Sequence, residues 1–232
     1  MAKINFFYQM RLIMNKILLY ACLLTIFFFS NSFYGQTNIW EKEIMVFERC
    51  DSLNSPESGG IVFVGSSSIR GWRTLSNDFP NQNVLNRGFG GSELGDVIYF
   101  FDRIVAKYKP KQIILYAGDN DISSGKSPDA VFEKFKEFYR KMKVELPGSE
   151  LLFLSIKPSI ARWEMYTEMQ KVNCMVENFA SNRKKVGFID ISTDMLGDDG
   201  KPKPEFFLED GLHMSKEGYE FWKEKVEPYL EH

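Results

Sequence analysis

A histidine close to the C-terminal end of the chain is the first residue that could do acid–base chemistry. The chain has two histidines, and one of them, His232, is its final residue, where fraying is expected. The other, His213, follows Asp210 by three residues, a spacing at which a tight turn lets the carboxylate bind one ring nitrogen. The second ring nitrogen could then take a proton from a nucleophile. The same residues also fit a polar turn that leads into a helix capped by Ser215.

Small and polar residues follow three of the predicted strands. Residues 65–70 follow the first strand, residues 86–92 the second and residues 117–121 the third. In a parallel sheet covered by helices, functional groups gather at the carboxyl ends of the strands. We therefore expect these segments to form one site. Its candidate nucleophiles are three consecutive serines, Ser66, Ser67 and Ser68.

Five short apolar runs alternate with longer amphipathic segments after residue 38. The expected strands are residues 61–64, 83–86, 112–116, 151–156 and 186–189. The expected helices are residues 40–53, 94–107, 128–146, 162–184 and 215–230. This alternation predicts a single α/β domain over residues 36–232, a three-layer α/β/α sandwich around a five-stranded parallel sheet.

Taken in order, the polar segments resemble the four sequence blocks of the SGNH (GDSL) hydrolase superfamily. The resemblance implies a flavodoxin-like fold and serine ester hydrolase activity without metal or cofactor. Carried onto this chain, it makes Ser67 the nucleophile, with Asp210 and His213 as orienting carboxylate and base. It also implies an oxyanion hole formed by the backbone of Ser67, by Gly91 and by Asn120. A helix beginning near the nucleophile would add partial positive charge there.

The chain departs from the family pattern at Ser66, where the family more often has Asp. That position is not one of the catalytic groups, so we expect activity to survive. The departure leaves Ser66 and Ser68 as alternatives to Ser67 for the nucleophile. The pattern G-x-S-x-G does not occur around Ser67, which argues against an α/β-hydrolase.

Several cationic and aromatic residues near the strand ends are candidates for substrate binding. They are Arg70, Trp72, Arg87, Arg162 and Trp163. Trp and Arg suit sugar stacking and hydroxyl recognition, although core tryptophans and solvated arginines are equally consistent with these positions. No long apolar lid is visible, so we expect short acyl groups, such as O-acetyl on a carbohydrate. A lipid acylhydrolase or thioesterase, and a non-catalytic carbohydrate-binding protein on the same scaffold, are the alternatives.

The N-terminus has the pattern of a secretory signal. Residues 17–29 are an uninterrupted apolar run of about thirteen residues, preceded by Lys3, Arg11 and Lys16. The run is shorter than a membrane span requires. We expect a signal peptide over residues 1–35 and an exported protein. An uncleaved membrane anchor, which would be the only contact with a membrane, and a buried N-terminal helix are the alternatives.

Charge and cysteine content exclude several classes of function. The formal net charge is −2, and it becomes about −5 without the three basic residues of the N-terminal segment. A nucleic-acid partner is therefore not expected, because phosphate backbones require a basic face. Cys50 and Cys174 lie next to no His or second Cys, which argues against a metal or redox site. A disulfide between them and two unpaired thiols both remain open.

Overall fold

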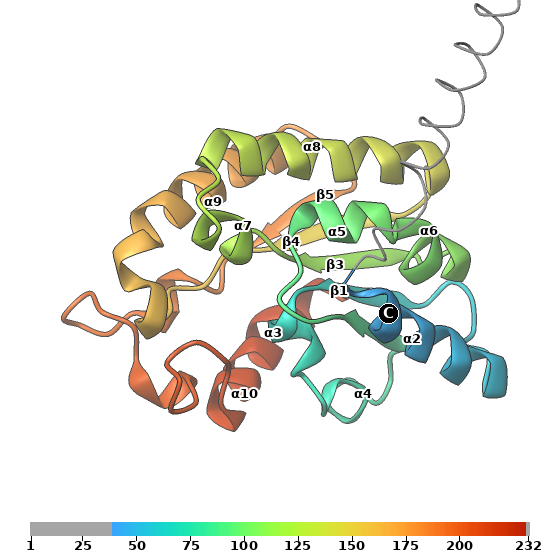
Figure 1. The fold of residues 1–232 in the computed structure, drawn as a ribbon, viewed down its shortest axis with the longest axis horizontal. Coiled ribbons are helices and arrows are strands. Elements are labelled where there is room, and N and C mark those ends of the chain that lie inside the picture. Colours follow the sequence, from blue (N-terminus) through green and yellow to red (C-terminus); the bar gives the residue numbers. More distant parts are fainter. Residues whose placement is uncertain (1–38, 231–232) are drawn as a thin grey trace, which may run out of the picture. The chain divides into compact units, whose positions relative to one another are not determined.

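The computed structural model describes residues 39–230, and its centre is a five-stranded parallel sheet. The strands are β1 (Ile61–Gly65), β2 (Val84–Gly88), β3 (Gln112–Tyr116), β4 (Glu150–Leu154) and β5 (Val186–Ile189). Their order is β2-β1-β3-β4-β5. After β1 the chain forms β2 on one side of β1, and it then crosses over to form β3 on the other side (Figure 1). The predicted three-layer α/β/α fold is confirmed.

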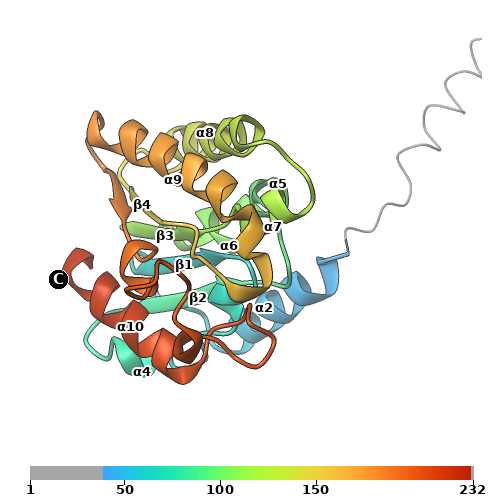
Figure 2. The ribbon, with the colours of Figure 1, turned by 90° about the vertical axis from the view of Figure 1, so that its left-hand side faces the viewer.

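Helices cover both faces of this sheet (Figures 1 and 2). One face carries α5 (Leu94–Tyr99), α6 (Phe101–Ile104), α8 (Pro128–Glu145) and α9 (Tyr166–Ser181). The other carries α3 (Ser67–Arg70), α4 (Leu75–Asp78) and α10 (Lys216–Val226). Two further helices are α2 (Glu41–Leu53) and α7 (Asp119–Ser123). Asp51 of α2 accepts a hydrogen bond from Arg87 of β2, and α7 follows β3.

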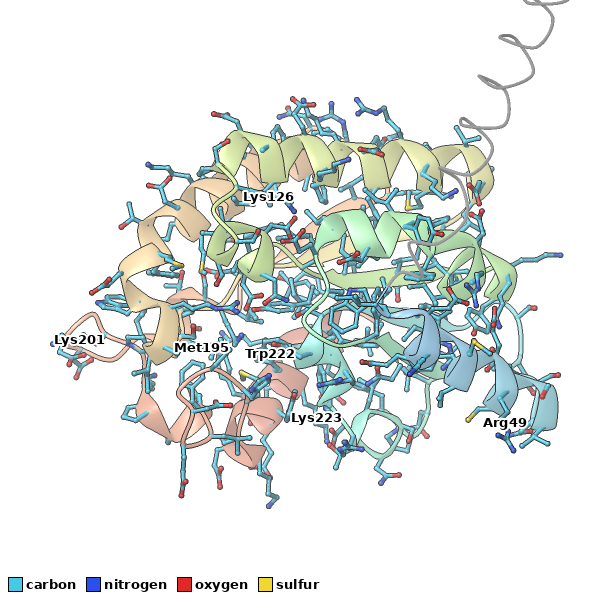
Figure 3. The ribbon with its side chains drawn as sticks, viewed as in Figure 1. Arg49, Lys126, Met195, Lys201, Trp222 and Lys223 are labelled. Atoms are coloured by element: carbon cyan, nitrogen blue, oxygen red, sulfur yellow. The ribbon has the colours of Figure 1, made fainter. Side chains whose placement is uncertain are left out.

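The strands β1, β3 and β4 are largely continuous apolar runs because side chains on both of their faces are buried. Ile61 and Phe63 of β1 pack into the core on the α10 side, whereas Val62 and Val64 point to the α8 side. Trp222 and Met195, both labelled in Figure 3, belong to the α10-side core. The sheet is therefore shared by two apolar layers, and only its edges and strand ends are left for polar groups.

Two of the predicted helices differ from the observed ones. The segment 94–107 is divided into α5, α6 and a 3₁₀ turn, with the break at Phe100 (φ −91°, ψ 3°). This break lets Phe100 and Phe101, adjacent in sequence, both become fully buried. The helix expected from residue 162 begins instead at Tyr166, because residues Ile160–Met165 form a 3₁₀ segment (η2) in which Arg162 has a non-helical backbone.

The sequence predictions for the N-terminus lie outside the described residues, since the apolar run 17–29 is not among them. Between residues 39 and 230, no helix combines the length and apolar character needed to cross a bilayer. Cys50 and Cys174 are both exposed free thiols, which excludes the alternative of a disulfide between them.

Candidate active site

The strand register brings the three polar segments to one edge of the sheet. Gly65, the last residue of β1, is paired with Gly88 of β2 on one side and Tyr116 of β3 on the other. Gly65 has φ +139°, and a Cβ atom there would lie 1.8 Å from the carbonyl oxygen of Tyr116. No other residue fits this position. The chain can therefore turn sharply out of β1 and present the next residues at the carboxyl edge.

Of the three candidate nucleophiles, Ser67 is the one that faces an imidazole. Its Oγ lies 3.2 Å from Nε2 of His213. Ser66 and Ser68 are buried; the Oγ of Ser68 accepts a hydrogen bond from Lys157 (3.3 Å), and that of Ser66 has no partner among the described residues. Ser67 begins the short helix α3, so its backbone N–H has no carbonyl partner within that helix.

Asp210 fixes the orientation of the imidazole. Its Oδ2 lies 2.6 Å from Nδ1 of His213, and its Oδ1 accepts the backbone N–H groups of Leu212 and His213 at 2.9 Å. The side-chain hydrogen bond from His213, followed by these two backbone bonds, lowers the pKa of Asp210 to about 2. An ionised carboxylate can only accept, so Nδ1 carries a proton in this bond and Nε2 is the ring nitrogen that faces Ser67.

The Asp210–His213 turn is anchored to the body of the domain on both sides. An antiparallel bridge joins the buried residues Phe207 and Met214, and the backbone N–H of Leu208 donates to the carbonyl of His213 (2.8 Å). From α10, the hydroxyl of Tyr219 donates to the backbone carbonyl of Ser68 (2.9 Å). The residues that flank the Asp210–His213 turn are thus buried, and α10, which follows the turn, contacts the segment that carries Ser67.

Gly91 and Asn120 lie next to each other on the loops that follow β2 and β3. A Cβ atom at Gly91 would be 3.9 Å from Nδ2 of Asn120. That Nδ2 donates to the carbonyl of Ser92 (3.0 Å), and the hydroxyl of Ser92 donates to the carbonyl of Gly65 (3.2 Å). The loops after β1, β2 and β3 are therefore connected by hydrogen bonds.

Glu43 of α2 binds two residues at this edge of the sheet, Arg70 and Gly90. This contact was not predicted from the sequence. Oε2 of Glu43 accepts the backbone N–H of Gly90 (3.0 Å), while Nη1 of Arg70 donates to Oε1 of the same carboxylate (3.2 Å). Glu43 is 47 positions away from Gly90 in an amphipathic helix, and nothing in the sequence pattern indicates that the two residues are in contact. Arg70 itself is half-exposed near Ser67, and its predicted contact with substrate stays a prediction.

Trp72 does not have the predicted role in substrate binding. Its side chain is fully buried in the α10-side core and stacks on Tyr219, with ring centroids 5.5 Å apart. Its indole N–H donates to Oδ2 of Asp78 (2.7 Å). With no exposed face, Trp72 cannot stack on a sugar, and the prediction is wrong for this residue.

Arg87 is likewise structural. It is 6% exposed, and its guanidinium lies 4.9 Å from the ring centroid of Phe47 and 4.8 Å from that of Tyr108. It donates to the hydroxyl of Tyr108 (2.7 Å) and forms an ion pair with Asp51 of α2. These partners occupy the donors that a substrate would need, so the prediction is wrong here too.

Arg162 and Trp163 lie on the η2 segment beside the site. Nη1 of Arg162 donates to Oδ1 of Asn120 (3.0 Å). The Trp163 ring stacks on Tyr166 with centroids 5.2 Å apart and 20° between the planes. Both rings line a cavity of about 520 Å³, whose other lining residues include Leu196 and Gly200.

A buried ion cluster beneath the site was not predicted. Nζ of Lys157 lies 3.1 Å from the Tyr116 hydroxyl, 3.3 Å from the Ser68 hydroxyl and 3.2 Å from Oδ2 of Asp119. Burial lowers the pKa of Lys157 against the opposing pull of Asp119. Burial also acts to raise the pKa of Asp119, but the charges of Lys157 and Arg162 outweigh it and the pKa is lowered. The available signal was a lysine directly after an apolar strand, a residue type almost never buried without a partner.

Known proteins share this architecture. A multidomain esterase from Ruminococcus flavefaciens is 26% identical over 134 residues, which cover 54% of this chain and 17% of that protein. A solved structure from Streptococcus pneumoniae, described as a platelet activating factor, is 22% identical with a TM-score of 0.73, covering 90% of this chain and 99% of that one. An acetyl-xylooligosaccharide esterase from Geobacillus is 16% identical with a TM-score of 0.58, covering 74% and 94%.

The similarity extends to a family model. The model of the GDSL-like lipase/acylhydrolase family matches residues 57–221. This match includes all five strands of the sheet and the Asp210–His213 turn. The chain therefore belongs to the GDSL-like lipase/acylhydrolase family, a family of ester hydrolases.

Proposed function

We propose that this chain hydrolyses carboxylic esters with Ser67 as nucleophile, His213 as general base and Asp210 as the carboxylate that orients the base. The observation that carries the proposal is a continuous relay. Asp210 Oδ2 lies 2.6 Å from Nδ1 of His213, and Nε2 of the same ring lies 3.2 Å from Ser67 Oγ. This is the arrangement that activates a serine hydroxyl, whatever the fold that holds it.

The chemistry proceeds in two halves. The Oγ of Ser67 attacks the ester carbonyl carbon while its proton passes to Nε2 of His213, and the carbonyl electron pair moves onto oxygen. Collapse of this intermediate breaks the bond to the alcohol, which leaves with the proton from Nε2. A water molecule then repeats the steps on the acyl-enzyme and releases the acid. Asp210 stays ionised throughout, because its pKa is about 2, and it stabilises the imidazolium.

The negative oxygen formed in each half requires hydrogen-bond donors. We assign them to the backbone N–H groups of Ser67 and Gly91 and to Nδ2 of Asn120. Nδ2 has two hydrogens, and one of them binds the carbonyl of Ser92. The second hydrogen is available for the oxyanion. Loss of one such donor typically lowers kcat by about 10²–10³.

Labelling with a fluorophosphonate probe tests the nucleophile. Ser67→Ala and His213→Ala should each abolish turnover of p-nitrophenyl acetate, and Ser67→Ala should also abolish labelling. The matched control is Ser66→Ala, which removes a neighbouring buried hydroxyl that has no hydrogen-bond partner among residues 39–230. Labelling that persists in Ser67→Ala and disappears in Ser66→Ala would reassign the nucleophile. Circular dichroism checks that each variant is folded.

For the substrate, we infer a short acyl group, such as acetyl, carried on a carbohydrate. The stacked pair Trp163–Tyr166 lines a cavity of about 520 Å³, and Trp163 directly follows Arg162, which bonds to Asn120. A half-buried indole that lines a cavity suits the apolar face of a sugar ring. The structural similarity to an acetyl-xylooligosaccharide esterase is consistent with this inference.

A comparison of two substrates tests this inference. Trp163→Ala should raise KM for acetylated xylooligosaccharides about tenfold or more, since it removes the stacking surface, and leave hydrolysis of p-nitrophenyl acetate within about twofold. Tyr99→Ala, which removes an exposed aromatic ring of α5, should change neither. Equal losses on both substrates would contradict a sugar-binding role. Activity that rises with p-nitrophenyl ester chain length beyond C8 would favour a lipid substrate instead.

We also propose that the protein is exported by its N-terminal apolar segment, residues 17–29. Expression of the full chain in a bacterial host, followed by cell fractionation, tests this. The expected product lies outside the cytoplasm and has lost about 35 residues, which N-terminal sequencing would detect. A product that keeps residues 17–29 and sediments with membranes would indicate an anchor.

A further inference from the structure

The amide of Asn120 is held by two partners whose chemistry is unambiguous. Nη1 of Arg162 lies 3.0 Å from Oδ1 of Asn120, and the carbonyl of Ser92 lies 3.0 Å from Nδ2. A guanidinium can only donate and a backbone carbonyl can only accept. The amide can therefore satisfy both partners in one orientation only, with its oxygen toward Arg162 and its NH₂ group toward Ser92.

Arg162 in turn forms an ion pair with the carboxylate of Asp119. Its Nη1 lies 3.3 Å from Oδ1 of Asp119, and Oδ2 of the same carboxylate lies 3.2 Å from Nζ of Lys157. Asp119 and Lys157 are fully buried, and the Arg162 side chain is 16% exposed. The carboxylate of Asp119 lies between the cations of Lys157 and Arg162. With all three groups ionised, the cluster has one net positive charge next to the Asn120 amide.

From these contacts we infer that Arg162 is a positioning residue for the hydrolysis reaction: it locks and polarises the Asn120 amide so that an N–H of Nδ2 points at the developing oxyanion. The inference rests on the proposed function. A flipped Asn120 would place Oδ1 against the negative oxygen and repel it. A charge-assisted bond to Oδ1 also draws electron density away from Nδ2, which strengthens its remaining hydrogen as a donor.

This role differs from the one that the sequence suggested for Arg162. A substrate-binding arginine would lower affinity when removed, and its loss would add to the loss of Asn120. A residue that acts through Asn120 would lower kcat instead, and its removal would have no further effect once the amide is gone. The two roles therefore make opposite predictions for a double-mutant cycle.

The experiment is that cycle, with p-nitrophenyl acetate as substrate. Arg162→Met should lower kcat by about tenfold to a hundredfold with KM within about twofold, a smaller loss than the about 10²–10³ expected for Asn120→Ala. The double variant should match Asn120→Ala within about twofold. Arg162→Lys, which retains a donor, should recover part of kcat. Arg140→Met, the same change on an exposed residue of α8, should behave as the wild type.

A second readout does not depend on activity. In a ¹H–¹⁵N spectrum, the side-chain NH₂ pair of Asn120, assigned by its loss in Asn120→Ala, should shift in Arg162→Met and stay unchanged in Arg140→Met. Additive losses in the double variant, a rise in KM instead of a fall in kcat, or an unmoved NH₂ pair would each overturn the inference. All three outcomes leave the role of Ser67 intact, whereas turnover by Ser67→Ala would overturn the proposed function itself.

Discussion

At the residue scale, the charge state of Asp210 contributes to the stability of the fold. Its ordinary pKa is 3.8, and the hydrogen bond from His213, followed by two backbone N–H groups, lowers it to about 2. Between these two values the unfolded chain binds more protons than the folded one. Ionised Asp210 therefore stabilises the fold fully above pH 3.8, and this contribution is lost as the pH falls through 2.

Replacement of Asp210 by Asn should remove this pH-dependent contribution. We expect the variant to be less stable by about 1 kcal/mol near pH 6, a value reduced because the side chain is half-exposed and screened by solvent. The difference from the wild type should shrink as the pH is lowered from 4 toward 2. Urea unfolding at several pH values measures it. Asp198→Asn, in an exposed turn, is the control, and a difference that does not vary with pH would contradict the prediction.

The roles of some single residues could be predicted from the sequence, and those of others could not. His213 could be selected because the chain has only two histidines, and Asp210 because of its spacing from His213, whereas Ser67 was chosen over Ser66 and Ser68 only through the family resemblance. Trp72 could not be distinguished from an exposed tryptophan, because its burial depends on residues far away in the sequence, such as Tyr219. Lys157 was missed because its partners, which include Ser68 and Asp119, lie elsewhere in the sequence.

At the scale of elements, α2 connects two segments near the site through the side chain of Glu43. Glu43 accepts the N–H of Gly90 at 3.0 Å, and Arg70 donates to the same carboxylate. The contact joins α2 to the loop after β2 and to the end of α3. Because Gly91 follows Gly90 directly, the position of its N–H depends on a helix that contributes no catalytic group.

Glu43→Ala should therefore slow the reaction without weakening substrate binding. We expect kcat for p-nitrophenyl acetate to fall about tenfold, because a loosened Gly90–Gly91 backbone meets the oxyanion less well, while KM changes by less than about twofold. Glu133→Ala removes an exposed carboxylate of α8 that pairs with Lys136 and should leave both constants unchanged. An unaltered kcat in Glu43→Ala would show that Gly91 is positioned without α2.

Most elements could be predicted from periodicity, and the exceptions have physical causes. The five strands agree with the prediction to within about two residues, and β1, β3 and β4 are largely buried apolar runs. The helix expected over 94–107 breaks at Phe100, where tertiary packing of two adjacent phenylalanines overrides helical periodicity. The helices α4 and α7 were missed, and α3 was expected only as a helix start near Ser67, because each has only four or five residues, too few to display a period.

At the scale of the whole molecule, the α10-side core connects the site to the last helix. Trp222 of α10 is fully buried, with ring centroids 5.0 Å from Tyr116 and 6.0 Å from Trp72. Met214, the residue after the proposed base, packs in the same core. Loss of this packing would release α10 and the Asp210–His213 turn together.

Trp222→Ala should accordingly destabilise the protein by about 3–5 kcal/mol, the usual cost of removing a large buried aromatic side chain. Urea unfolding measures the change, and esterase activity should disappear at a lower urea concentration in parallel. Trp222→Phe should cost less, and Tyr229→Ala, which removes a half-exposed ring just after α10, should cost little. Activity that persists to the wild-type urea concentration in Trp222→Ala would separate the site from this core.

The proposed nucleophile and base are 146 positions apart along the chain, and this separation has a consequence for biosynthesis. A ribosome synthesises Ser67 146 residues before His213. Until the segment from Phe207 through α10 has been made and has folded against the sheet, Ser67 is an ordinary alcohol. We therefore expect a polypeptide that ends before His213 to lack the base that would activate Ser67.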